Sequence, residues 1–195
     1  MAKPLDGMLV VSVEQALAAP LCTARLAEAG ARVIKIERPG TGDPMRALSL
    51  QPEQQGVPPG FRALNAGKKS VVIDLATDEG RAAVLRLAES ADVFVENFRP
   101  GVARRLGLGA EDIRAVRPGI VYCSISGWGQ SGPNSARGAY DHVIQAATGM
   151  MALQGSDSGA PPVKVGFPLV DIATGISAAE AILAALIRRL RGDTA

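Results

Sequence analysis

The sequence is poor in the residues that build metal sites and disulfide scaffolds: it has one histidine, His142, and two cysteines, Cys22 and Cys123. Two cysteines in core-forming stretches predict reduced thiols in a cytoplasmic protein. No cluster of Cys and His has metal-ligand spacing, so we expect no metal site. A Ser-His-Asp relay would have to use His142, which directly follows Asp141 in a helical stretch and has no Gly-x-Ser-x-Gly turn beside it. We therefore do not expect that relay.

An excess of charge of one sign is also absent. Lysine and arginine number 21 against 19 aspartates and glutamates, a formal net charge of +2, so we expect no nucleic acid partner. The first residues lack the long apolar run of a signal peptide. The apolar stretch 172–187 is short for a membrane span and contains Glu180. It predicts a buried helix, and we expect no membrane partner.

Two nucleotide-binding fingerprints are missing as well. The stretch 14–20, which follows the first predicted strand, contains no Gly-x-Gly-x-x-Gly, so a standard NAD or FAD site is disfavoured. A phosphate-binding P-loop is absent too.

What the sequence does contain is an alternation of short apolar runs and helical stretches, which is typical of a parallel, doubly wound α/β sheet of Rossmann type. The predicted strands are 8–13, 32–37, 70–75, 92–96 and 119–125. The predicted helices are 20–29, 78–90, 110–116, 140–151 and 171–190, with Thr77 or Asp78 as the cap of the second. The segment 39–60 is rich in Pro, Gly and Gln and predicts a long surface loop.

Sheets of this kind bind ligands beyond the carboxyl ends of their strands, and arginines follow two of those ends. Arg38 follows the strand 32–37, and Arg104 and Arg105 come shortly after the strand 92–96. A planar guanidinium can hold phosphate bidentately, so the pair of positions suits a nucleotide-like ligand. For any single arginine a surface salt bridge is the simpler explanation.

Two further features each have two interpretations. The glycine-rich segment 124–133, with the only tryptophan, Trp128, either allows a ligand to approach the backbone closely or is a plain loop. Asp171 stands where an extended stretch changes into the longest predicted helix. By helix chemistry alone it is a cap, although a carboxylate at that place can also be a nucleophile held by backbone N–H groups.

Taken together, the segments resemble the family III CoA-transferases, a superfamily that includes the alpha-methylacyl-CoA racemases. The resemblance covers nearly the whole chain and rests on the order and spacing of seven segments. These are 4–7, 33–43, Lys68-Lys-Ser70, Asp92-Val-Phe-Val-Glu-Asn-Phe-Arg-Pro-Gly101, Ser126-Gly-Trp-Gly129, Tyr140-Asp-His-Val-Ile-Gln-Ala146 and Pro168-Leu-Val-Asp171.

The resemblance implies a CoA-transferase that moves CoA between an acyl-CoA and a small carboxylic acid. Asp171 matches the catalytic aspartate, which forms an aspartyl anhydride and then an aspartyl-CoA thioester, and helix N–H groups are expected to keep it ionised. Tyr140 and Asp141 match positions beside the acyl group. The matching CoA-binding positions are Gln15, Leu17, Ala18, Arg38, Ile73, Leu75, Asn97, Phe98 and Arg105. Acyl-CoA is a substrate, and no tightly bound cofactor is implied.

Departures from the family pattern leave alternatives open. Leu17 replaces a glutamine of the formyl-CoA transferases, which argues against formate and oxalate. Tyr140 replaces a racemase histidine and favours a transferase, although His142 lies nearby.

Family members are longer and form interlocked homodimers, so residues 1–195 are expected to be an incomplete Rossmann-like CoA-binding domain. A racemase that uses Asp171 as acid and base, and an inactive CoA-binding fragment, are the alternatives.

Overall fold

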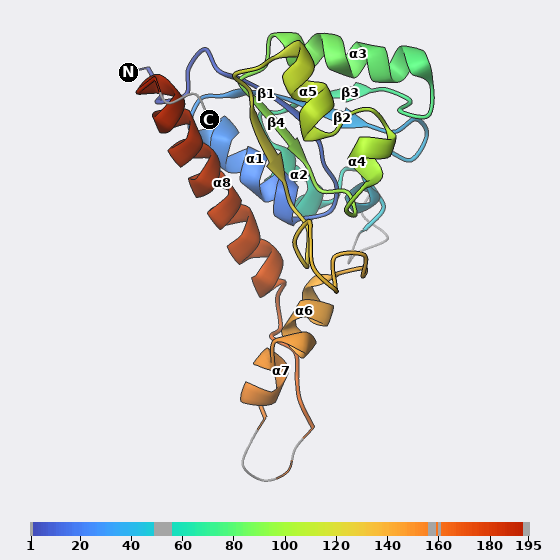
Figure 1. The fold of residues 1–195 in the computed structure, drawn as a ribbon. Coiled ribbons are helices and arrows are strands. Elements are labelled where there is room, and N and C mark those ends of the chain that lie inside the picture. The colour runs from blue at the N-terminus through green and yellow to red at the C-terminus, as the bar shows by residue number, and fades with distance from the viewer. Residues whose placement is uncertain (1, 49–55, 156–158, 160, 193–195) are drawn as a thin grey trace.

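A computed structural model of the chain describes residues 2–48, 56–155, 159 and 161–192. Its centre is a sheet of five parallel strands in the order β3-β2-β1-β4-β5 (Figure 1). The strands are β1 (Leu9–Val13), β2 (Arg32–Glu37), β3 (Lys69–Val72), β4 (Val93–Glu96) and β5 (Val121–Ser124). This order reverses direction between β1 and β4, as in doubly wound sheets, and confirms the predicted fold class.

Helices cover both faces of this sheet because the central strands are apolar on both sides. On one face Val10, Val33 and Val95 pack against α1 (Ala18–Glu28) and α8 (Leu169–Leu190). On the other face Val11 and Phe94 pack against α3 (Asp78–Glu89) and α5 (Ala110–Val116). Successive residues of one strand thus serve two cores, which fixes the register of the sheet.

The remaining elements of the described residues are shorter. They are a 3-10 turn (Pro44–Arg46), α2 (Pro59–Asn65), α4 (Val102–Arg105), α6 (Asp141–Ala147) and α7 (Met150–Leu153). α6 and α7 belong to an extension that projects away from the sheet (Figure 1). The extension returns directly into α8, so the first turn of α8 lies at the same edge of the sheet as the loops after the strands.

Several predicted boundaries are wrong. The segment 39–60 is not a plain loop, because it contains the 3-10 turn and leads into α2, while residues 49–55 lie outside the described residues. The predicted helix 140–151 is divided into α6 and α7 at Gly149, whose φ of 78° breaks the helical path. α4 was not predicted at all, since its four residues are too few for a periodic pattern. Thr77 does cap α3, and its hydroxyl accepts a hydrogen bond from the Gly80 N–H.

The prediction that the apolar stretch 172–187 is a buried helix is right for one face only. Gly175, Ala179, Ile182 and Leu186 are buried against α1 and the sheet. On the remaining surface α8 exposes several large apolar side chains, among them Ile187 at 50% and Leu190 at 73%. Among the residues that the structure describes, α8 is the one helix long and apolar enough to cross a membrane, by length and composition.

α8 passes close to α1 at Gly175. A Cβ added there would lie 2.7 Å from the Ala18 carbonyl oxygen and 3.0 Å from the Leu21 Cβ. We predict that Gly175→Ala lowers the free energy of unfolding by about 1–3 kcal/mol, because the helices must move apart. Urea unfolding measures this change. Gly119→Ala is the matched control, since a Cβ at Gly119 meets nothing within 4 Å, and equal effects of the two variants would contradict the prediction.

Candidate active site

Two adjoining hollows lie at the carboxyl edge of the sheet, where β1 and β4 end. The first has a volume of about 230 Å³ and the second about 540 Å³. They share Gln15 and Phe98, so one elongated ligand could occupy both. Their place at the point where the strand order reverses is where doubly wound sheets bind ligands.

The hollows bring together most of the predicted site residues. The first is lined by Gln15, Arg38, Leu75 and Phe98. The second is lined by Gln15, Leu17, Ala18, Asn97, Phe98, Tyr140 and Asp171. Ile73, Arg105 and Asp141 line neither hollow. Ile73 is half-buried against the core, and Arg105 lies exposed at the end of α4.

The turn after β1 forms the boundary between the hollows, and Asn97 holds its backbone. The Asn97 side chain accepts a hydrogen bond from the Gln15 N–H at 3.0 Å and donates one to the Gln15 carbonyl at 2.9 Å. Both ends of this amide are therefore used on the turn. Asn97 shapes the site by fixing Gln15.

Arg38 stands at the wall of the first hollow. Its Nε donates to the Gly42 carbonyl at 3.0 Å, which directs the guanidinium along the segment that follows β2. The apolar side chains of Leu75 and Phe98 line the same hollow. An arginine beside apolar surfaces suits a ligand that carries both phosphate and a flat ring.

Asp171 is not the cap of α8, because the helix begins two residues earlier, at Leu169. The capping carboxylate is that of Asp141, whose Oδ2 accepts hydrogen bonds from the Val170 N–H at 2.7 Å and the Asp171 N–H at 3.1 Å. Gln145 in turn holds Asp141, since its Nε2 donates to Asp141 Oδ1 while its Oε1 accepts from the Val165 N–H.

The helix N–H groups that we expected to hold the Asp171 carboxylate are hydrogen-bonded to Asp141 instead. Burial, and then the nearby charge of Asp141, raise the pKa of Asp171. Burial is the larger cause, and Asp141, which occupies the first N–H groups of the helix, adds a like charge beside Asp171. The Asp171 carboxylate thus faces the second hollow as a more basic, and so more nucleophilic, group than an ordinary aspartate.

Other candidate side chains around the hollow are placed as follows. Tyr140 is 72% exposed and stacks on His142, with ring centroids 5.9 Å apart, and His142 itself does not line the hollow. Both cysteines are free, and burial raises the pKa of the Cys123 thiol to about 11, so neither is an activated nucleophile. In the described part of the chain, no group of three or more His, Cys, Asp and Glu side chains is arranged to hold a metal ion.

The glycine-rich segment after β5 forms part of the second hollow. Ser126 and Gly127 line it, and Trp128 packs against Arg137, whose guanidinium carbon lies 5.0 Å from the ring centroid. A Cβ at Gly127 would lie 2.1 Å from the Ala139 Cβ, so glycine is required there for the chain to pass. Trp128 itself does not line the second hollow and packs against Arg137, which does.

Comparison with known proteins decides the family. Residues 5–195 match the family model for CoA-transferase family III. The chain belongs to CoA-transferase family III. It is 42% identical over 189 residues to the mouse succinyl-CoA:glutarate CoA-transferase, an alignment that covers 97% of this chain and 43% of that protein. It is 40% identical to the acetyl-CoA:oxalate CoA-transferase of Acetobacter aceti, which covers 96% of this chain and 48% of that protein.

Solved structures of the family agree. Rv3272 from Mycobacterium tuberculosis superposes with a TM-score of 0.91 at 41% identity, over 97% of this chain and 52% of that one. A CAIB/BAIF family protein from Brucella suis gives a TM-score of 0.89 at 39% identity, over 98% and 51%. The chain spans about half the length of the relatives that it matches. The fold is therefore that of the first half of a family III enzyme.

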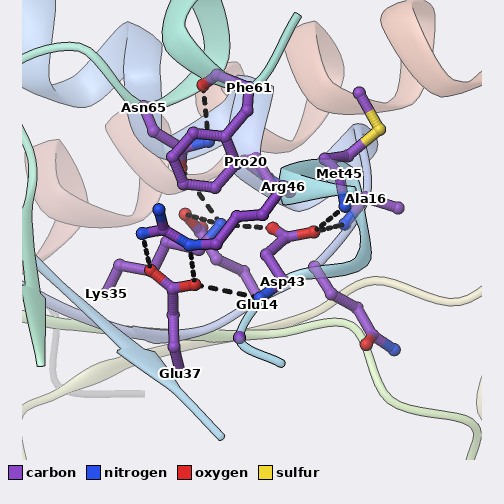
Figure 2. A network of polar contacts seen from close by, with 12 residues as sticks. Glu14, Ala16, Pro20, Lys35, Glu37, Asp43, Met45, Arg46, Phe61 and Asn65 are labelled. Atoms are coloured by element: carbon purple, nitrogen blue, oxygen red, sulfur yellow. Dashed lines mark hydrogen bonds and ion pairs between the residues drawn. The ribbon is translucent and has the colours of Figure 1, made fainter. Parts of the chain in front are cut away.

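A set of charged side chains lies beneath the first hollow, and the sequence patterns did not predict it. We call this set the buried charge network (Figure 2). Its members are Glu14, Lys35, Glu37, Asp43, Arg46 and Lys68. Lys35 Nζ donates to Asp43 Oδ2 at 2.5 Å, and Lys68 Nζ donates to Glu14 Oε1 at 2.8 Å. The sequence did contain a signal. Lys35 and Glu37 are two charged residues in the apolar strand 32–37, and their spacing places both on one buried face of β2.

Glu37 anchors the outer part of the network. Arg46 donates two hydrogen bonds to its carboxylate, from Nη2 at 2.6 Å and from Nε at 2.7 Å. The Ser70 hydroxyl and the Asp43 N–H also donate to this carboxylate. These hydrogen bonds, those of Arg46 foremost, lower the pKa of Glu37 to about 2. In many dinucleotide enzymes an acid near this strand end binds ribose hydroxyls, whereas here the carboxylate is occupied by the protein.

The lowered pKa of Glu37 has a consequence for acid stability. A depressed pKa contributes stability above the ordinary value, 4.5, and that contribution is lost as the pH falls towards 2. We predict that the wild type loses about 2 kcal/mol more than Glu37→Gln between pH 5 and pH 2, a figure discounted because Arg46 is partly in solvent. Urea unfolding at several pH values measures both proteins. Parallel curves for the two would contradict the assignment.

Proposed function

We propose that this chain contributes the CoA-binding half and the nucleophile of an enzyme that transfers CoA between an acyl-CoA thioester and a small carboxylic acid. The observation that carries the proposal is the half-buried Asp171 carboxylate at one end of the paired hollows, with Arg38 at the other. An acyl-CoA is an elongated molecule with phosphates at one end and a thioester at the other. The paired hollows offer the matching chemistry at each end.

In the proposed reaction, a carboxylate oxygen of Asp171 attacks the thioester carbon of the donor. The C–S bond breaks, CoA leaves as thiolate, and a mixed anhydride between the acyl group and Asp171 remains. The thiolate then attacks the aspartyl carbonyl, which releases the donor acid and leaves an aspartyl-CoA thioester. The acceptor acid reverses these two steps with its own carboxylate, so one difficult exchange is divided into four easier ones.

The electrostatics of the site favour the first attack. The pKa of Asp171 is raised by burial and by Asp141, so its carboxylate is a stronger base than a solvated one. Since only the ionised form attacks, the rate should fall as the pH drops through this raised pKa. The pair Asp141 and Gln145 would act as positioning residues, because together they fix the helix turn that carries Asp171.

The acceptor acid needs a cationic partner in the second hollow. Arg99 and Arg137 line that hollow, and both are exposed to an incoming carboxylate. Relatives named for glutarate and oxalate use dicarboxylic acids. A small dicarboxylic acid is therefore the acceptor class that we propose. The interlocked homodimer and the cytoplasmic location stay predictions.

The proposal is tested with the full-length gene product, succinyl-CoA and a panel of mono- and dicarboxylic acids, with acyl-CoA products resolved by mass spectrometry. We expect glutaryl-CoA or a related acyl-CoA to form, together with an equal amount of succinate. Deuterium incorporation at the α-carbon of a 2-methylacyl-CoA in D2O, without any transfer, would identify a racemase instead. Binding of CoA with neither reaction would identify a binding module.

A further inference from the structure

The turn between β1 and α1 contains an unusual backbone conformation. Ala16 has a φ of 63°, and it is the one non-glycine residue with a positive φ in the described part of the chain. For a residue with a Cβ, the left-handed region is disfavoured by roughly a factor of ten in population. Such a conformation persists only where the surroundings hold it. Ala16 lies between Gln15 and Leu17, which both line the second hollow.

Asp43 supplies the contact that holds Ala16. Its Oδ1 accepts a hydrogen bond from the Ala16 N–H at 3.1 Å and another from the Met45 N–H at 2.9 Å (Figure 2). Asp43 lies 27 residues further along the chain, in the segment after β2, and is only 3% exposed. The contact therefore joins two separate loops at the edge of the sheet.

Lys35 fixes the other oxygen of the same carboxylate. Its Nζ donates to Asp43 Oδ2 at 2.5 Å and to Asn65 Oδ1 at 3.0 Å. Lys35 is 1% exposed and comes from the middle of β2, so the carboxylate is tied to the rigid sheet. A hydrogen bond between two buried ions is strong and directional. The position of Asp43 Oδ1, and with it that of Ala16, is thereby set.

Asp43 also lines the first hollow, so a direct contact with a ligand has to be considered. Three protein donors already occupy its two oxygens: the N–H groups of Ala16 and Met45, and Lys35 Nζ. An ionised carboxylate only accepts hydrogen bonds, so it has no donor to offer to a phosphate or to another carboxylate. The geometry thus favours an indirect role.

We infer that Asp43 is a positioning residue for acyl-CoA: it holds Ala16 in the left-handed conformation and so places Gln15 and Leu17 at the wall of the hollows. The inference rests on the proposed function, since the ligand that it concerns is CoA. Loss of the contact lets Ala16 relax to negative φ. The binding-competent turn then becomes a minor population, and the apparent Kd rises by the inverse of that fraction.

The test measures the effect of Asp43→Ala in two backgrounds. The first background has the native Ala16. The second carries the substitution A16G, because glycine adopts positive φ about as readily as negative φ. Calorimetric titration with CoA should show that Asp43→Ala raises the Kd roughly tenfold in the first background. In the A16G background Asp43→Ala should raise the Kd less than about threefold, since glycine at position 16 adopts the positive φ without the hydrogen bond to Asp43.

A second readout does not depend on CoA. Hydrogen exchange at the Ala16 amide should accelerate at least about tenfold in Asp43→Ala, because its acceptor is gone. Asp6→Ala is the matched control: Asp6 also accepts a backbone N–H, that of Lys3, but in an exposed turn far from the site. Thermal unfolding of each variant confirms that the fold is retained. The double variant Asp43→Leu with Lys35→Met, which removes the acceptor and leaves no unpaired buried charge, replaces any Asp43→Ala variant that unfolds.

The outcomes separate the two claims. A wild type that binds CoA while Asp43→Ala leaves both the Kd and the Ala16 exchange rate unchanged would overturn the inference alone. Equal losses of affinity in the two backgrounds would also overturn it, since Asp43 would then act through general stability or direct contact. A full-length gene product with no affinity for CoA would overturn the proposed function, and with it this inference.

Discussion

Replacement of Asp171 by asparagine is expected to reduce CoA transfer by at least about 10³-fold. Asparagine has nearly the same shape as aspartate, but its amide oxygen is a poor nucleophile and forms no anhydride. Initial rates of acyl-CoA exchange in the full-length gene product measure the effect. A variant with more than about a tenth of the wild-type rate would exclude Asp171 as the nucleophile.

The same variant should not be less stable than the wild type at neutral pH. The pKa of Asp171 is raised in the folded state, so its contribution to stability is present at low pH and lost as the pH rises through the raised value. Asparagine carries no charge to bury beside Asp141. A melting temperature equal to or above that of the wild type would show that lost activity reflects chemistry and not unfolding.

Replacement of Lys35 by methionine is expected to lower the free energy of unfolding by about 3–5 kcal/mol. The Lys35 and Asp43 side chains are 1% and 0% exposed, so the variant leaves a buried carboxylate without its cation. Methionine fills a similar volume, which separates loss of charge from loss of packing. Urea unfolding followed by circular dichroism measures the change.

A surface ion pair provides the matched control. Arg25 and Glu28 are paired at 2.8 Å, but their side chains are 57% and 65% exposed. Arg25→Met should therefore cost only about 0–1 kcal/mol. If Lys35→Met cost no more than Arg25→Met, the buried charge network would not hold the edge of the sheet together.

The sequence was sufficient for the fold where patterns are local. β2 and α5 have the predicted bounds, because the run 32–37 and the capped heptapeptide 110–116 carry their own signals. α8 starts two residues early because its first N–H groups are satisfied by Asp141, which comes from a different helix. A helix end that depends on a residue 29 positions away leaves no local pattern.

The candidate site was predicted in part for the same reason. Arg38, Asn97 and Asp171 follow strand ends or start a helix, so topology alone brings them to one edge. The role of Asp43 was hidden, because it depends on a backbone angle at Ala16 and on a lysine from the middle of a strand. The resemblance to a family pointed to Asp171 as the candidate nucleophile, but not to the burial and the neighbouring Asp141 charge that raise its pKa.

The role of Asp171 is tested most directly by finding where the covalent intermediate forms. The full-length gene product is mixed with acyl-CoA, quenched with hydroxylamine, digested, and its peptides are analysed by tandem mass spectrometry. We predict a hydroxamate on Asp171 that depends on acyl-CoA and is absent from Asp171→Asn. A hydroxamate on another carboxylate, or transfer without any labelled peptide, would contradict it.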